Sequence, residues 1–212
     1  MAMLAVLRSM REPPAFGAVV FLLALLPMAF AVVGVGSDLL LHTRYFGANP
    51  IRTSEHYLGL WTFHFLLMTL AITPLRQVTG WVWLTRHRRK LGLFAFAYLT
   101  AHWLVYAVLD VQLDWHDLTV DLTKRPYIMI GMAALVGMLA LAVTSTRNMM
   151  RRLGRRWGQL HRVVYLVAIL GLIHHFMAVK KDITEPLIHT ALLTVLLGAR
   201  LVWTLRARQA RD

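Results

Sequence analysis

Six apolar stretches, each long enough to cross a membrane as a helix, constrain the fold of this chain more than any other feature. They cover residues 16–36, 57–75, 91–109, 127–146, 159–179 and 187–205. A helix needs about 20 residues to cross a hydrocarbon layer of about 30 Å. Backbone polar groups in lipid must be satisfied within the protein, and these runs lack the alternation of barrel strands. We therefore expect an all-α, polytopic membrane protein, built as a six-helix transmembrane bundle.

The composition agrees with a membrane protein and excludes a soluble one. The chain has 212 residues, of which 58% are hydrophobic and 16% are charged, whereas soluble domains carry about 25% charged residues. The net charge of +13 would indicate nucleic-acid binding in a soluble protein. Here the basic residues flank the spans, so we expect membrane lipid and no nucleic acid as the partner. The first span is longer than the apolar core of a signal peptide, which has about 7–15 residues, and we expect it to be retained.

The loops between the spans differ in charge, and this difference predicts the topology. Basic residues gather after the second, fourth and sixth spans, whereas the third loop carries the acidic residues Asp110, Asp114, Asp117 and Asp121. Cytoplasmic loops are enriched in Lys and Arg, so both termini are expected in the cytoplasm. We predict a cytoplasmic N-terminus over 1–15, a membrane domain over 16–205 and a cytoplasmic tail over 206–212, with no internal repeat.

Three histidines inside the spans indicate a haem site. His102 lies midway along the third span, and His161 and His174 lie on the fifth. Ionisable residues at membrane depth are costly and tend to face a functional interior, and imidazole is an axial ligand of haem iron. The chain has no cysteine, which excludes disulfides, cysteine-ligated clusters and covalently attached haem. Any haem is therefore b-type.

The spacing of these histidines leaves one choice open. His161 and His174 are separated by a rise of about 20 Å, which allows two haem levels, but on a straight helix they point more than about 90° apart. The adjacent His175 aligns better with His161, unless a π-bulge between them restores the alignment of His174. We expect His64, inside the second span, and His175 to support the redox site. The loop histidines His42, His87 and His116 are expected to be solvated.

Several motifs taken together resemble one known family. They are Ile72-Thr73-Pro74-Leu75, Arg88-Arg89-Lys90-Leu91-Gly92-Leu93, Lys124-Arg125-Pro126-Tyr127, the run from Thr144 to Trp157, and Gln159-Leu160-His161. This combination resembles the MsrQ/YedZ family of haem-binding membrane subunits, part of the ferric reductase-like transmembrane superfamily. The similarity runs from about residue 45 to 205.

The resemblance implies a cofactor, its ligands and a partner. It implies b-type haem between the third and fifth spans, with His102, His161 and His174 as axial ligands, and it favours His174 over His175. Larger relatives have two ligands on each helix, whereas the third span here has one, so one haem or two remain open. The resemblance alone implies FMN, and it implies a periplasmic molybdopterin-containing methionine sulfoxide reductase as the electron acceptor.

We therefore expect an electron-transfer subunit in the bacterial inner membrane, an electron carrier rather than the catalytic subunit of its complex. The expected electron donor is a cytoplasmic flavin reductase or the quinone pool. Arginines can clamp haem propionates or a flavin phosphate through paired hydrogen bonds. The candidates are Arg88, Arg89, Arg155, Arg156 and Arg162. The alternatives are a quinone-linked or metal-reducing cytochrome b of the same superfamily, and a haem-free transporter whose histidines relay protons.

Overall fold

The computed structural model describes residues 11–179 and 182–209, and its regular structure over these ranges is entirely helical. The first ten residues of the predicted N-terminal segment and the last three of the predicted tail lie outside the described residues. Six helical segments are long and apolar enough to cross a membrane: Phe16–Leu40, Pro50–Thr79, Val82–Asp110, Pro126–Val143, Arg155–Ala178 and Thr184–Arg206. This confirms the predicted six-helix membrane bundle.

Several of these spans are built from more than one helical element. The elements are α2 (Phe16–Leu40), α3 (Pro50–Thr79), the 3₁₀-helix η1 (Val82–Arg86), α4 (Arg88–Leu104), the π-helix η2 (Val105–Asp110), α5 (Trp115–Lys124), α6 (Pro126–Val143), α7 (Arg147–Leu153), α8 (Arg155–Leu160), α9 (Val163–Ala178) and α10 (Thr184–Gln209). The third span joins η1, α4 and η2, and the fifth joins α8 and α9.

Local sequence signals set the ends of several helices. Asn49 caps α3 by accepting a hydrogen bond from the Arg52 N–H at 3.1 Å, and Pro50 follows at the first helical position. Both residue types are preferred at these positions. Gly80 ends the same helix with φ of 79°, in the left-handed conformation that glycine adopts without steric cost. Pro126 likewise starts α6.

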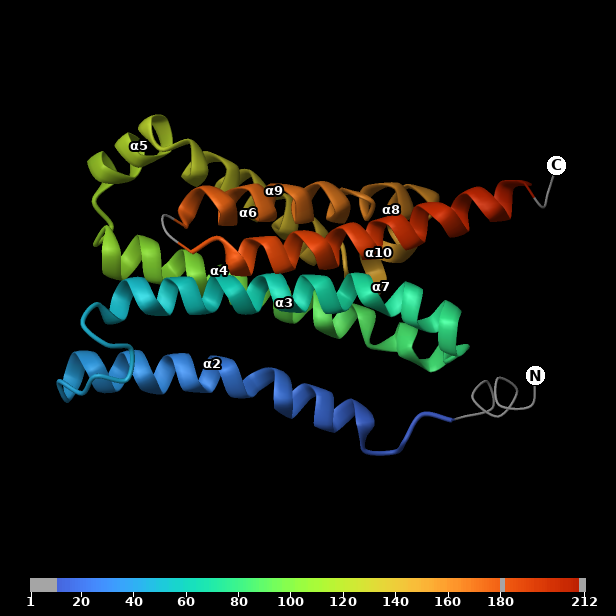
Figure 1. Ribbon diagram of the computed structural model, residues 1–212, viewed down its shortest axis with the longest axis horizontal. Coiled ribbons are helices and arrows are strands. Elements are labelled where there is room, and N and C mark those ends of the chain that lie inside the picture. The colour runs from blue at the N-terminus through green and yellow to red at the C-terminus, as the bar shows by residue number, and fades with distance from the viewer. Residues whose placement is uncertain (1–10, 180–181, 210–212) are drawn as a thin grey trace.

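The helices run up and down, so the two ends of the bundle differ. In Figure 1, α2 begins and α10 ends at the side that also carries α7 and α8, whereas α5 lies at the opposite side. We call the α5 side the outer end and the α7–α8 side the inner end, following the charge of the loops. The orientation of the termini in the membrane itself stays a prediction.

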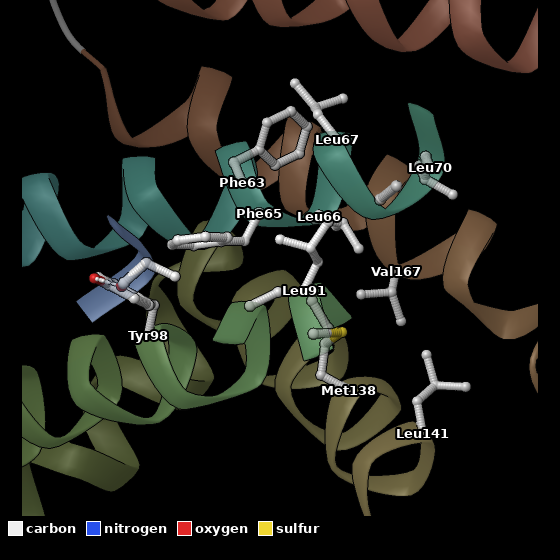
Figure 2. Close-up of a cluster of buried hydrophobic side chains, with 14 of the residues drawn as sticks. Phe63, Phe65, Leu66, Leu67, Leu70, Leu91, Tyr98, Met138, Leu141 and Val167 are labelled. Carbon is white, nitrogen blue, oxygen red and sulfur yellow. Dashed lines mark hydrogen bonds between the residues drawn. The ribbon is translucent and has the colours of Figure 1, made fainter. Parts of the chain in front are cut away.

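Helix α3 lies at the centre of the bundle. It packs most extensively on α4 and also contacts α2, α9 and α10, while α6 packs mainly on α9. Figure 2 shows the core where these helices meet: Phe65, Leu66 and Leu70 of α3 lie near Leu91 of α4 and Val167 of α9. The core holds the two helix pairs, α3–α4 and α6–α9, against each other.

Two polar contacts tie peripheral helices to this core. The fully buried Tyr98 hydroxyl donates to the Ala24 carbonyl of α2 at 2.7 Å. Arg200 of α10 donates through Nη2 to the Leu70 carbonyl of α3 at 2.6 Å, and through Nη1 to the Tyr165 hydroxyl of α9 at 2.6 Å. Leu70 has this carbonyl available because Pro74, four residues later, lacks the N–H that would normally bond to it. Pro74 lies inside α3, which continues to Thr79.

The structure differs from the sequence expectations in two other places. The acidic third loop contains the short helix α5, capped by Asp114, whose side chain accepts from the His116 and Asp117 N–H groups. The prediction that His87 is solvated was wrong. Its side chain is 4% exposed and its Nε2 lies 2.8 Å from Glu12 Oε1, because the chain before α2 folds over the turn between η1 and α4.

We expect Arg200→Leu to lower the thermal stability of the bundle, because the Leu70 carbonyl loses its donor. Leaving one buried polar group unpaired costs about 1–3 kcal/mol. Adding Pro74→Ala returns an N–H to that carbonyl and should recover part of the loss. Thermal unfolding of the detergent-solubilised protein, followed by circular dichroism, measures both effects. Arg206→Leu, at an exposed site on the same helix, is the control; equal losses at the two arginines would contradict this account.

Candidate functional site

One cavity of about 700 Å³ opens among α3, α4, η2, α6 and α9, in the outer half of the bundle. This volume lies within the usual range for sites that bind small molecules and cofactors. Its apolar lining includes Leu60, Phe63, Leu99 and Leu135, and its polar lining includes Arg52, Glu55, His102, Arg125 and His174. Apolar walls with a few convergent polar groups are typical of a cofactor pocket.

His102 and His174 enter this cavity from the two helix pairs with the same hydrogen bond. His102 Nδ1 lies 2.8 Å from the Glu55 carbonyl of α3, and His174 Nδ1 lies 2.7 Å from the Tyr127 carbonyl of α6. A carbonyl can only accept, so each Nδ1 carries the hydrogen and each Nε2 keeps its lone pair. Imidazoles that bind metal ions usually have this arrangement, in which the second nitrogen donates to the protein.

The two imidazoles face each other at a distance that suits a shared metal ion. Their ring centroids are 6.2 Å apart and their planes cross at 80°. A metal bound by Nε2 of two imidazoles separates the centroids by about 6 Å, since each bond is about 2 Å long and each nitrogen lies about 1 Å from its ring centre. Within the described residues, no protein group hydrogen-bonds to either Nε2. The chemistry of these two donors therefore fits haem iron held between α4 and α9.

Two arginines line the same cavity near its outer end. Arg125 precedes α6, and its Nε lies 3.0 Å from Asp121 Oδ1, while the other oxygen of that carboxylate accepts from the Tyr106 hydroxyl at 2.9 Å. Contact with the Tyr127 side chain and the charge of Asp121 raise the pKa of Arg125, so it stays charged. Arg52 lies in the first turn of α3. These two guanidinium groups are the cations available for haem propionates in this cavity.

The five arginines predicted from the sequence lie elsewhere. Arg88, Arg89, Arg155, Arg156 and Arg162 are exposed, and none of them lines the cavity. Helix α8, which carries Arg155 and Arg156, lies at the inner end of the bundle (Figure 1). Arg88 donates through Nη2 to the Thr73 hydroxyl. Sequence reasoning missed Arg52 and Arg125 because it looked for anion-binding arginines in the basic loops. The signal that was present is their position at the outer ends of spans, where few cations occur.

His161 does not join His102 and His174. It ends α8, where its Nδ1 lies 3.1 Å from the Trp157 carbonyl and its Nε2 lies 3.5 Å from the Ser145 hydroxyl. Its ring stacks on Trp157 with centroids 3.9 Å apart. The structure shows no π-bulge between His161 and His174. The fifth span instead breaks between α8 and α9, and the π-helix of the described chain is η2, just after His102.

His64 and His175 belong to a second histidine cluster, two of whose members, His56 and His175, also line the cavity. His175 stacks on His56 with centroids 6.0 Å apart and lies 5.5 Å from His189, which in turn lies 5.1 Å from His64. His56 Nε2 pairs with Glu185 Oε2 at 3.3 Å. His175 Nε2 and His189 Nδ1 are buried without a hydrogen-bond partner. His174 thus turns toward His102, whereas its neighbour His175 turns toward α3 and α10.

Comparison with known proteins agrees with this architecture. Residues 58–172 match the family described as "Ferric reductase like transmembrane component". A protein of Rhodospirillum rubrum is 47% identical over 193 residues, 90% of this chain and 89% of that protein. One of Ralstonia nicotianae is 46% identical over 96% of this chain and 94% of its own length, and one of Xanthomonas oryzae pv. oryzae is 46% identical over 83% and 78%. All three are named "Protein-methionine-sulfoxide reductase heme-binding subunit MsrQ".

The chain belongs to the MsrQ family. The resemblance seen in the sequence motifs is thereby confirmed, and so is the prediction of a multi-pass membrane protein, which is consistent with the bacterial inner membrane. The matched region runs from Leu58 in α3 into α9 and so contains most of the central helix α3 and most of the cavity walls, including His102. The name of the MsrQ relatives, a heme-binding subunit, agrees with the donor chemistry of the His102–His174 pair.

Proposed function

We propose that this protein is a b-type haem subunit that passes electrons across the inner membrane to a periplasmic, molybdopterin-containing methionine sulfoxide reductase, which repairs oxidised periplasmic proteins. The carrying observation is the pair His102 and His174, which line one cavity with ring centroids 6.2 Å apart and each contact a backbone carbonyl through Nδ1. The MsrQ relatives support the haem and the methionine sulfoxide reductase partner. If both side chains held the iron, no open position would remain for a substrate, which suits electron transfer rather than catalysis on a substrate.

Each residue of the cavity has a role in this proposal. A bound haem would supply a reversible one-electron change at its iron. His102 and His174 would hold the iron, and their Nδ1–H bonds to the Glu55 and Tyr127 carbonyls fix the ring orientation and raise the basicity of Nε2. Arg52 and Arg125 would bind the two propionates through charge-assisted hydrogen bonds. The apolar part of the lining would keep water away from the bound group.

His161 would serve only a second haem, at the inner end. It does not line the cavity, and its Nδ1 contacts the Trp157 carbonyl while its Nε2 contacts the Ser145 hydroxyl. Two haems per chain would assign His161 to the inner one. One haem per chain would leave His161 with a packing role.

We expect His102→Ala and His174→Ala each to remove most of the haem of the outer cavity, because a single imidazole leaves one axial position empty. Purified variants are compared by haem per chain and by oxidised and dithionite-reduced absorption spectra. His116→Ala, at an exposed position on α5, should leave both unchanged. If His102→Ala or His174→Ala keeps a normal low-spin spectrum with full haem content, the ligand assignment is wrong.

The two ends of the bundle differ in charge, and in this proposal each end would contact one redox partner. The exposed arginines of the inner end would meet an acidic surface on a cytoplasmic flavin reductase or the phosphate of FMN, whose binding stays a prediction. The outer end carries α5, with its exposed residues Trp115 and Asp117. Asp121 is not part of that surface, because it is buried against Tyr106 and Arg125.

We expect the double change Asp114→Asn and Asp117→Asn to slow electron delivery to the periplasmic partner without changing the haem spectrum, because rim charges act mainly on association rates. Asparagine caps helices as well as aspartate does, so α5 should persist. Stopped-flow reoxidation of the reduced subunit by the purified reductase measures the rate, at low and at high salt. An unchanged rate at low salt would remove α5 from the docking surface.

A quinone-linked cytochrome b is the second candidate, and one observation favours it over a metal-reducing one. His175 Nε2 and His189 Nδ1 are buried without a hydrogen-bond partner on neighbouring rings of α9 and α10, and a quinol hydroxyl is a group that would pair with them. Both candidate functions use the same histidine pair, His102 and His174, and they differ in the molecule that donates the electrons.

We expect a soluble ubiquinol analogue to reduce the haem of the purified protein if the quinone pool is the donor, and His189→Leu to abolish that reaction while dithionite still reduces the haem. The change removes the hydrogen-bonding nitrogen at a buried site of similar volume. Reduction by an NADH-driven flavin reductase alone, with none by the quinol analogue, would assign the donor to the cytoplasm.

A further inference from the structure

The two candidate haem-ligand histidines are each held against a neighbouring helix by the same kind of hydrogen bond. In both cases the imidazole donates to a backbone carbonyl that precedes it by 47 residues, Glu55 for His102 and Tyr127 for His174. Both acceptors lie inside helices, and helix carbonyls normally accept only from the N–H one turn later. A carbonyl has two lone pairs and can accept a second hydrogen bond if a donor can approach it.

A glycine one helical turn after each acceptor makes that approach possible. Gly59 follows Glu55 by one turn in α3, and Gly131 follows Tyr127 by one turn in α6. Side chains on a helix lean toward its N-terminus and cover the turn before their own Cα. A side chain at position 59 or 131 would therefore lie over the carbonyl that the histidine uses.

The space at the two glycines differs, and the difference is measurable. A Cβ at position 131 would lie 2.8 Å from His174 Nδ1 and 3.0 Å from its Cε1, which is too close for a carbon. A Cβ at position 59 would lie 3.4 Å from His102 Nδ1 and Cε1, a tight contact that a small shift relieves. An added methyl group therefore displaces His174 and only tilts His102.

The same arrangement of carbonyl, glycine and histidine therefore occurs twice in the described chain. The pairs α3–α4 and α6–α9 are the two most extensive helix packings of the described chain, and each consists of an acceptor carbonyl, a glycine one turn later and a histidine on the partner helix. The two copies of this arrangement bring both imidazoles to the lining of one cavity.

We propose that Gly59 and Gly131 are positioning residues that seat His102 and His174 on their acceptor carbonyls and thereby hold the two imidazole planes crossed at 80°. This inference rests on the proposed haem ligation by the same two histidines. Crossed axial imidazoles give ferric low-spin haem a strongly anisotropic electron paramagnetic resonance (EPR) signal, whereas parallel planes give a less anisotropic one. The orientation of the two imidazoles beside Gly59 and Gly131 can therefore be measured spectroscopically, separately from folding.

The experiment compares Gly131→Ala and Gly59→Ala with two control variants. Gly137→Ala adds a Cβ in the same α6–α9 interface, 2.6 Å from Val167 Cγ2 and without contact to a histidine. Gly198→Ala adds one in α10, where nothing lies within 4 Å. Alanine favours the helix more than glycine does. A loss of haem or of stability in these variants therefore cannot come from a lower helix propensity. For each variant, haem per chain, the EPR spectrum of the oxidised protein and the midpoint of thermal unfolding are measured.

We expect Gly131→Ala to lose most of its haem or to retain it with a less anisotropic signal, and Gly59→Ala to retain haem with a smaller shift of the same kind. Gly137→Ala should lower the unfolding midpoint but keep the wild-type EPR signal in the haem that it binds, and Gly198→Ala should change neither. If Gly131→Ala has wild-type haem content and the wild-type EPR signal, or if Gly137→Ala shifts the signal equally, the positioning role of the two glycines is refuted. Should Gly131→Ala not accumulate, the signal of Gly59→Ala decides alone.

The wild-type protein separates this inference from the proposed function. A wild-type protein that binds no haem would contradict the proposed function itself. A haem-bearing wild type whose EPR signal is not strongly anisotropic would contradict only the crossed imidazoles and their glycine seats.

Discussion

The hydrogen bond from a side chain to a backbone carbonyl of a facing helix is the interaction on which this bundle depends. In lipid there is no water to satisfy a polar side chain, and the helix carbonyls are the acceptors that are always present. Tyr98 uses Ala24 in this way, Arg200 uses Leu70, and the two histidines of the cavity use Glu55 and Tyr127. Each bond fixes the rotation of one helix against another, which apolar packing alone specifies weakly.

These bonds require carbonyls that are open to a second helix, and the sequence opens them in two ways. At Leu70 the proline four residues later removes the competing N–H group. At Glu55 and Tyr127 the glycine one turn later removes the covering side chain. Proline and glycine are usually interpreted as helix breakers, yet here Pro74, Gly59 and Gly131 lie inside continuous helices. Their cost in helix propensity is offset by the contacts between helices that they permit.

The number of spans and their approximate limits could be predicted from the sequence, because hydropathy over about 20 residues is set by the bilayer and not by the partners of a helix. The histidines His102 and His174 could be named for a similar reason, since imidazoles at membrane depth are rare. Interactions between distant segments could not be predicted. The burial of His87 depends on Glu12, and the arginines Arg52 and Arg125 line one cavity only once the helices of the bundle are assembled. Local sequence carries no signal for such convergence.

The choice between His174 and His175 shows where helical-wheel reasoning fails. The wheel assumes one continuous helix from His161 onward, and on that assumption His175 is the better aligned. The span breaks between α8 and α9, so the phase that His161 defines does not carry over to the residues of α9. The direction of His174 is set by its own contacts: Tyr127 accepts its N–H and Gly131 leaves room for its ring. In a helix with a break, the facing helix therefore selects which of two adjacent cavity histidines faces His102.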